Sequence, residues 1–179
     1  MTMEPSDPEN LHFWSFIDYA VERVSRELPS IDPVAMRLVF TLHRAANMVV
    51  YDLESTVHRP RGWSWPGFRV LFAIWLSAPV EARKVAELSG MSRAAVSALV
   101  NTLERDGLVR KERAAYDGRA LELSLTESGQ EAIASAFLAH NEREQEWAGA
   151  LTGDEKRTLI ELLGKLTTHS VAFDARHRA

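Results

Sequence analysis

The chain has 179 residues and no cysteine, and its 21 Lys and Arg residues against 25 Asp and Glu residues give a formal net charge of −4. With 46% hydrophobic and 26% charged residues, its composition is globular and excludes a disordered, collagen-like or rod-like protein. The lack of cysteine excludes a disulfide framework, a thiol redox switch and a zinc ribbon. No apolar run approaches the roughly 20 residues of a membrane-spanning helix, and the acidic first ten residues do not resemble a signal peptide. We therefore expect a cytoplasmic protein of one or two small domains with no membrane contact.

Apolar residues recur at helical spacing through the first half of the chain. This spacing predicts helices over about 11–28, 33–57 and 64–78. Ser64 is a suitable N-cap for the third helix, in which a proline is tolerated in the first turn.

Two shorter helices, over 81–89 and 92–106, are separated only by Gly90 and Met91, which is the spacing of a helix-turn-helix. Glycine suits the positive φ of such a turn, and Ser92 is placed to cap the second helix. The outward face of this helix is small and polar, so it could approach a DNA groove, bind a phosphate at its N-terminus and reach base edges. An ordinary helical hairpin with a solvated face is the simpler alternative. The predicted DNA contacts on this helix are Ser92, Arg93, Ala94, Ser97, Ala98, Asn101 and Arg105.

Beyond residue 107 the apolar period changes from helical to alternating. The pattern predicts a two-stranded hairpin over about 108–125, closed around the Asp-Gly turn at 117–118. An arginine on such a hairpin suits contact with a phosphate or with the minor groove, and a nearby carboxylate can fix its direction. Residues 81–119 hold eight basic and six acidic residues, whereas the segments on both sides are acidic. We add Arg113, Asp117 and Arg119 to the predicted DNA contacts.

Two further helices complete the pattern. Thr126 is placed to cap a long helix, and Thr152 with Glu155 forms a capping box for the last one. We expect His140 to lie in an acidic, solvated stretch of the long helix. The apolar stripes on 11–28, 133–151 and 159–166 are more than one small lobe can bury, which predicts a homodimer.

One stretch of the chain resembles the winged helix-turn-helix of the MarR transcriptional regulators: LSGMSRAAVSALVNTLERDGLVRKERAAYDGRALELSLTESG, residues 88–129. The likeness is carried by LERDGLV, by D-x-R in the hairpin and by LT-x-x-G after it, and it extends over about residues 34–168. It implies a dimeric repressor or activator whose recognition helices enter successive major grooves of a pseudo-palindromic operator. In that family pattern Ser92 caps the recognition helix, Arg119 is the wing arginine and Asp117 is its partner.

Two departures from the family pattern stand out. Ala98 occupies a position where many members have a basic or larger polar residue. The helix at 11–28 lies outside the usual family core, and we assign it to extra dimer surface. Without cysteine, the peroxide sensing of some members is excluded. The resulting fold class is all-α with a small two-stranded β-wing, in which a winged helix-turn-helix accompanies a helical dimerisation region. The expected regions are a flexible tail at 1–10, N-terminal dimerisation helices at 11–63, a winged helix-turn-helix at 64–126 and C-terminal dimerisation helices at 127–179.

Aromatic residues gather around the third helix. Packing in the core and in the dimer interface is the simpler interpretation. The alternative is a pocket between the dimer helices and the DNA-binding region, where members of the family commonly bind small aromatic acids that relieve DNA binding. The candidate ligand-binding residues are His43, Asn47, Trp65, Phe68, Arg69 and Trp75.

The sequence holds no motif for catalysis, for a cofactor or for a metal. It has no glycine-rich phosphate loop, nucleophile elbow or H-E-x-x-H pattern, and the spacing of His169, Asp174 and His177 fits no standard ligand set. We therefore expect a protein that is not an enzyme. A winged-helix interaction module without sequence-specific DNA binding is the second interpretation, which the acidic net charge and Ala98 keep open.

Overall fold

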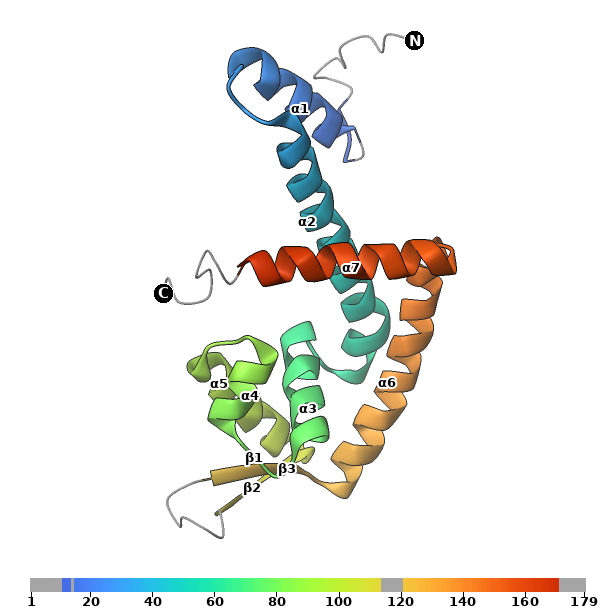
Figure 1. The fold of residues 1–179 in the computed structure, drawn as a ribbon. Coiled ribbons are helices and arrows are strands. Elements are labelled where there is room, and N and C mark those ends of the chain that lie inside the picture. Colours follow the sequence, from blue (N-terminus) through green and yellow to red (C-terminus); the bar gives the residue numbers. More distant parts are fainter. Residues whose placement is uncertain (1–10, 14, 114–120, 171–179) are drawn as a thin grey trace. The chain divides into compact units, whose positions relative to one another are not determined.

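Figure 1 shows the computed structural model of the chain, which describes residues 11–13, 15–113 and 121–170. The chain divides into two compact units, Met1–Ser55 and Thr56–Ala179. In the described part of the chain, no helix combines the length and the apolar character needed to cross a bilayer.

The first unit contains two helices, α1 (Phe16–Glu27) and α2 (Pro33–Leu53), which pack against each other. α1 is shorter than the predicted helix over 11–28. Asp32 caps α2, since its Oδ1 accepts hydrogen bonds from the backbone N–H groups of the second and third helical residues at 2.9 and 3.0 Å. The α-helix ends earlier than the predicted residue 57, because a π-helical turn over Glu54–His58 follows it.

The second unit begins in that turn and continues through a 3-10 turn, Arg59–Arg61. It combines α-helices with a small sheet, and Ser64 caps the first of these helices as predicted. The elements in chain order are α3 (Trp65–Ser77), β1 (Val80–Glu81), α4 (Ala82–Ser89), α5 (Arg93–Arg105), β2 (Val109–Arg113), β3 (Leu121–Leu125), α6 (Glu127–Ala148) and α7 (Gly153–Ser170).

The predicted fold class is confirmed: β2 and β3 form the two-stranded hairpin, and a short strand, β1, adds a third antiparallel strand in the order β1-β3-β2. Val80 of β1 pairs with Leu123, and Val109 of β2 pairs with Leu125. β1 has only two residues, which is too short for an alternating pattern to be visible in the sequence. The predicted hairpin tip lies outside the described residues.

The core of the second unit is built around α3. Leu71 and Ile74 of this helix are fully buried, and they belong to one cluster with residues of α4, α5, β3 and α6. One face of α5 is buried in this core, because Val96, Val100 and Leu103 are all at most 2% exposed. This packing fixes which face of α5 is left outside.

The start of α6 is held against Leu108, the residue before the strand β2. Thr126 caps α6 by accepting the N–H of Gly129 at 2.9 Å, and its own N–H donates to the carbonyl of Leu108 at 3.0 Å. A Cβ atom on Gly129 would lie 2.0 Å from that carbonyl oxygen. Only glycine therefore allows the helix to approach the strand this closely.

His140 on α6 is buried rather than solvated as predicted. The residue is 4% exposed and its ring faces His58, while Glu144 one turn further on is half-exposed. The acidic residues around His140 follow the solvent face of the helix, but the helical period turns His140 itself inward.

Candidate nucleic-acid interface

The turn between α4 and α5 has the geometry of a helix-turn-helix. Gly90 adopts a φ of 64°, and Met91 donates its N–H to the carbonyl of Ala86 at 3.0 Å. The hydroxyl of Ser92 accepts the N–H of Ala95 at 3.2 Å and so caps α5. The predictions for Gly90 and Ser92 are confirmed.

The guanidinium of Arg69 on α3 contacts this turn directly. It donates a hydrogen bond to the carbonyl of Ser89, the last residue of α4. That carbonyl has no partner within its own helix, and a cation at a helix C-terminus is electrostatically favourable. Arg69, predicted for a ligand pocket, thus lies against the helix-turn-helix.

The predicted contact residues of α5 all lie on its exposed face. The residues near the N-terminus of α5 are small apart from Arg93, so a groove wall could come close to the backbone there. Arg105 at the other end directs its Nε to Asp106 at 3.2 Å. The residues confirmed as exposed are Ser92, Arg93, Ala94, Ser97, Ala98, Asn101 and Arg105.

The strand β2 lies beside α5 and presents different residues on its two faces. Arg110 and Glu112 share the outer face and form an ion pair at 3.3 Å. Lys111 shares the inner face with buried Val109, and its Nζ donates to Asn101 Oδ1 and to Glu104 Oε2, both at 2.6 Å. Lys111 is not among the predicted DNA contacts, although strand alternation from Val109 places it toward the helix.

The remainder of the predicted wing is only partly described. Arg113 is exposed at the end of β2, where it pairs in register with Leu121. Asp117 and Arg119 lie outside the described residues.

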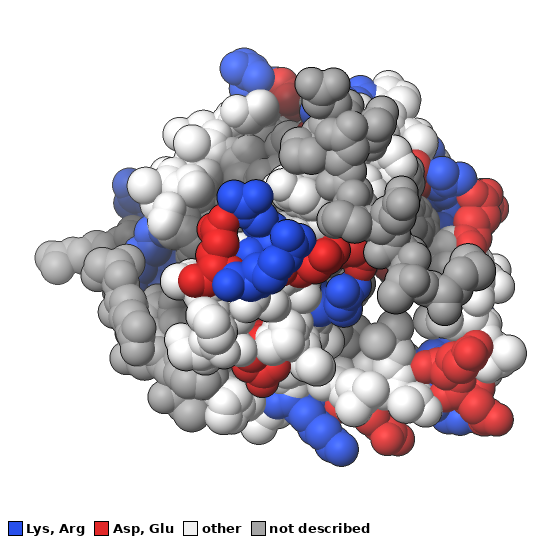
Figure 2. Space-filling view, turned by 90° about the horizontal axis from the view of Figure 1, so that it is seen from above, with Lys and Arg blue, Asp and Glu red and all other residues white. Residues whose placement is uncertain are grey.

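Most charged side chains near the helix-turn-helix already have a counter-charge. On α4, Lys84 donates to Glu87 at 2.7 Å, and this hydrogen bond and charge hold the pKa of Glu87 below its ordinary value. Figure 2 looks at the molecule from above the view of Figure 1, and on that face basic and acidic side chains are interspersed. Near the helix-turn-helix, Arg105 pairs with Asp106 and Arg110 with Glu112. A DNA contact by this chain therefore depends on particular side chains rather than on a broad basic surface.

The aromatic residues predicted for a ligand pocket form a packed ring cluster. Phe68 is 4% exposed and stacks on His58, with the ring centroids 4.0 Å apart, while Trp65 stacks on His140 at 5.9 Å. Trp75 meets Phe137 at 5.8 Å. In the first unit, His43 and Asn47 are exposed on α2, and Asn47 Nδ2 lies 3.1 Å from His43 Nε2.

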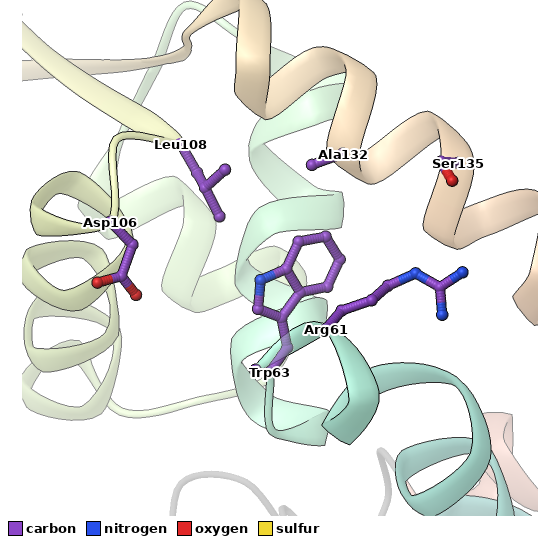
Figure 3. A pocket seen from close by; sticks show the side chains of 7 residues that line it. Arg61, Trp63, Asp106, Leu108, Ala132 and Ser135 are labelled. Atoms are coloured by element: carbon purple, nitrogen blue, oxygen red, sulfur yellow. The ribbon is translucent and has the colours of Figure 1, made fainter.

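The structure also contains a surface pocket that was not predicted from the sequence. Its volume is about 430 Å³. Figure 3 shows Trp63 in the middle, Asp106 at the end of α5 on one side, and Arg61 and Ser135 on the other. Its residues come from three separate segments, so no local pattern signals it. None of the six predicted ligand residues lines it.

Comparisons of the sequence and of the structure with known proteins point to the same family. The sequence profile of the MarR family matches residues 64–120. The uncharacterized HTH-type transcriptional regulator YwaE of Bacillus subtilis is 33% identical over 137 residues, which are 76% of this chain and 80% of the relative. The repressor CouR, solved on a 23-mer DNA duplex, is 26% identical with a TM-score of 0.67 over 73% of this chain and 92% of its own. PcaV of Streptomyces coelicolor, solved with its natural ligand, has the same fold, with 23% identity and a TM-score of 0.63 over 79% of this chain and 98% of its own.

Proposed function

Because this chain belongs to the MarR family of transcriptional regulators, we propose that it binds a pseudo-palindromic operator as a homodimer and that a small aromatic acid weakens this binding. α5 is the recognition helix in this proposal. The cytoplasm is the compartment in which such a regulator meets DNA.

The observation that carries the proposal is the exposed, capped face of α5 in a helix-turn-helix. The free N–H groups at its N-terminus, together with Arg93, suit a phosphate. Ser97 and Asn101 lie further along the same face and have the hydrogen-bonding groups to read base edges. By the family resemblance, Arg119 of the wing adds a contact to the minor groove or to the backbone.

The homodimer is supported by apolar side chains left exposed in both units. On α2, Val34 and Leu38 are 74% and 52% exposed, and on α7, Ile160 and Leu162 are 69% and 50% exposed. Large apolar residues exposed in such numbers are typical of an interface. A two-fold mate would place the recognition helices about 34–36 Å apart, one turn of B-DNA.

Regulation by an acid is supported by the position of Arg69, which belongs to α3 and contacts the turn between α4 and α5. The guanidinium has five N–H donors, of which the Ser89 carbonyl uses one. A carboxylate bound to Arg69, with the half-buried Trp65 as an apolar wall, would connect the ligand directly to the helix-turn-helix. A ligand changes DNA binding only if its own affinity differs between the arrangement of the protein that binds DNA and the arrangement that does not.

The proposal is tested with the full chain and labelled DNA from upstream of its own gene, compared with a scrambled duplex of equal length in fluorescence anisotropy. We expect tight binding to the first duplex only, with two protomers per duplex by light scattering. Equal, weak binding to both duplexes would instead support an interaction module without sequence-specific DNA binding. A monomer near 20 kDa at micromolar concentration would contradict the dimer.

A further inference from the structure

One side chain, that of Lys111, connects the strand β2 to the recognition helix. Its Nζ donates to Asn101 Oδ1 and to Glu104 Oε2 at 2.6 Å each, and its side chain is 23% exposed. The carboxylate of Glu104 compensates the ammonium charge. Lys111 is therefore held at the helix and is not free to extend toward a phosphate.

This contact determines which way the amide of Asn101 points. An ammonium group only donates hydrogen bonds, so the atom of Asn101 that faces it must be the carbonyl oxygen. The two orientations of an asparagine amide, which are otherwise hard to distinguish, are thereby separated. Within the described part of the chain, the amide nitrogen Nδ2 makes no hydrogen bond, and Asn101 is exposed.

On the basis of the proposed function, we propose that Lys111 is a positioning residue that makes Asn101 a donor-only reader of the major groove, selecting guanine over adenine. An unrestrained asparagine reads adenine with both ends of its amide, because Nδ2 donates to N7 while Oδ1 accepts from N6. Both ends must then face the base edge. Here Oδ1 faces β2, so only N–H donors are presented to the DNA.

Guanine suits such a donor because it offers two adjacent acceptors, O6 and N7, in the major groove. Adenine offers one acceptor and a competing N–H₂ donor there. The preference of Asn101 is thus set by a residue of the neighbouring strand that need not touch DNA itself.

The test selects binding sites from a duplex library in which the operator is randomised, using the full chain and matched variants. The Asn101→Ala variant identifies the base pair that Asn101 reads, because the base preference at that position should disappear. At that position wild type should prefer guanine to adenine. Lys111→Met keeps the aliphatic stem but frees Oδ1 of Asn101. The ratio of adenine to guanine at that position of the selected sites should therefore rise about tenfold.

Two controls separate positioning from a structural effect. Lys111→Arg retains donors for Oδ1 and should keep the wild-type preference. Arg110→Met removes the cation that pairs with Glu112 on the outer face of the same strand, so it should leave the preference unchanged even if affinity falls.

A test with a second variant, Asn101→Asp, gives a result whether or not Lys111→Met folds. Asn101→Asp keeps an acceptor for Lys111 and presents its other oxygen to the groove. Its preference should move from guanine to cytosine, whose N4 donates.

A wild-type protein that selects no sequence at all would contradict the proposed function. A wild-type protein that selects an operator, but with adenine preferred at the base read by Asn101, would overturn the present inference alone. The inference would also be overturned if Asn101→Ala changed the base preference at no position of the operator. The same outcome follows if Lys111→Met and Asn101→Asp both leave the base preference unchanged.

Discussion

The Nε2 atom of His58 lies 3.2 Å from the Nδ1 atom of His140, a residue 82 positions later in the chain. Both side chains are buried, at 0% and 4% exposure, and His140 Nε2 lies 3.1 Å from the carboxylate of Glu144. A carboxylate only accepts, so with neutral imidazoles His140 donates from Nε2 and accepts at Nδ1, while His58 donates from Nε2. One chain of hydrogen bonds thus ties the turn before α3 to the middle of α6.

Removing either imidazole should destabilise the protein strongly. His140→Ala leaves a cavity against Phe68 and a buried donor on His58 without its acceptor, so we expect a loss of about 3 kcal/mol in the free energy of unfolding. Urea denaturation measures it. In the double variant with His58→Ala, the loss should be smaller than the sum of the single losses. The exposed His12→Ala is the control, and a His140→Ala loss as small as that of His12→Ala would contradict the pairing.

Gly129→Ala should weaken the junction between the wing and α6. The added Cβ would lie 2.0 Å from the carbonyl oxygen of Leu108, so the helix or the strand must move. We expect a loss of about 3 kcal/mol or more, measured by thermal unfolding. Gly164→Ala on α7, where a Cβ meets nothing within 4 Å, should be neutral or slightly stabilising. Equal effects of the two substitutions would refute this account.

Arg119→Ala should weaken binding to every DNA sequence. If this wing arginine contacts a phosphate or the minor groove, the slope of log affinity against log salt should fall in magnitude by about one. Anisotropy titrations at several salt concentrations measure this slope. The control is Arg157→Ala, which removes an exposed arginine of α7. A slope that is the same for Arg119→Ala and wild type would show that Arg119 makes no such contact.

A small aromatic acid should quench tryptophan fluorescence and weaken operator binding in the same concentration range. A tenfold loss of DNA affinity requires about 1.4 kcal/mol of preference for the arrangement that does not bind DNA. Arg69→Met should abolish the effect of the acid if the guanidinium holds its carboxylate. Quenching with unchanged DNA affinity would show that the bound acid is not regulatory. Unfolding of Trp65→Ala would instead assign these aromatic residues to the core alone.

The capping box of α7 should make stability depend on pH at the acid end. The carboxylate of Glu155 accepts the backbone N–H and the hydroxyl of Thr152, both at 2.8 Å, and these bonds lower the pKa of Glu155. Because the folded pKa is below the unfolded one, this stabilisation is fully present above the ordinary pKa of glutamate. It is lost as the pH falls through the lowered value. Glu155→Gln should therefore lower the Tm at neutral pH, and the difference from wild type should vanish in acid. A difference that persists at low pH would contradict the assignment.

Sequence alone located the elements whose signals are local. A cap, a turn glycine and the apolar stripe that follows them all act within about one helical turn. Gly90, Ser92 and the Thr152–Glu155 box were predicted for this reason, and the structure confirms each of them. The exposed face of α5 followed from the same helical period.

Tertiary structure decided everything that depends on partners distant in sequence. β1 is too short to show a pattern and is defined only by its pairing with β3. Arg69 reaches the carbonyl of Ser89, and Lys111 reaches Asn101, because folding brings separate elements together. The composition and spacing of this chain determined that α5 would form and which face it would present. The orientation of the groups on that face depends on long-range contacts, which have no periodicity in the sequence and arise only when the core packs.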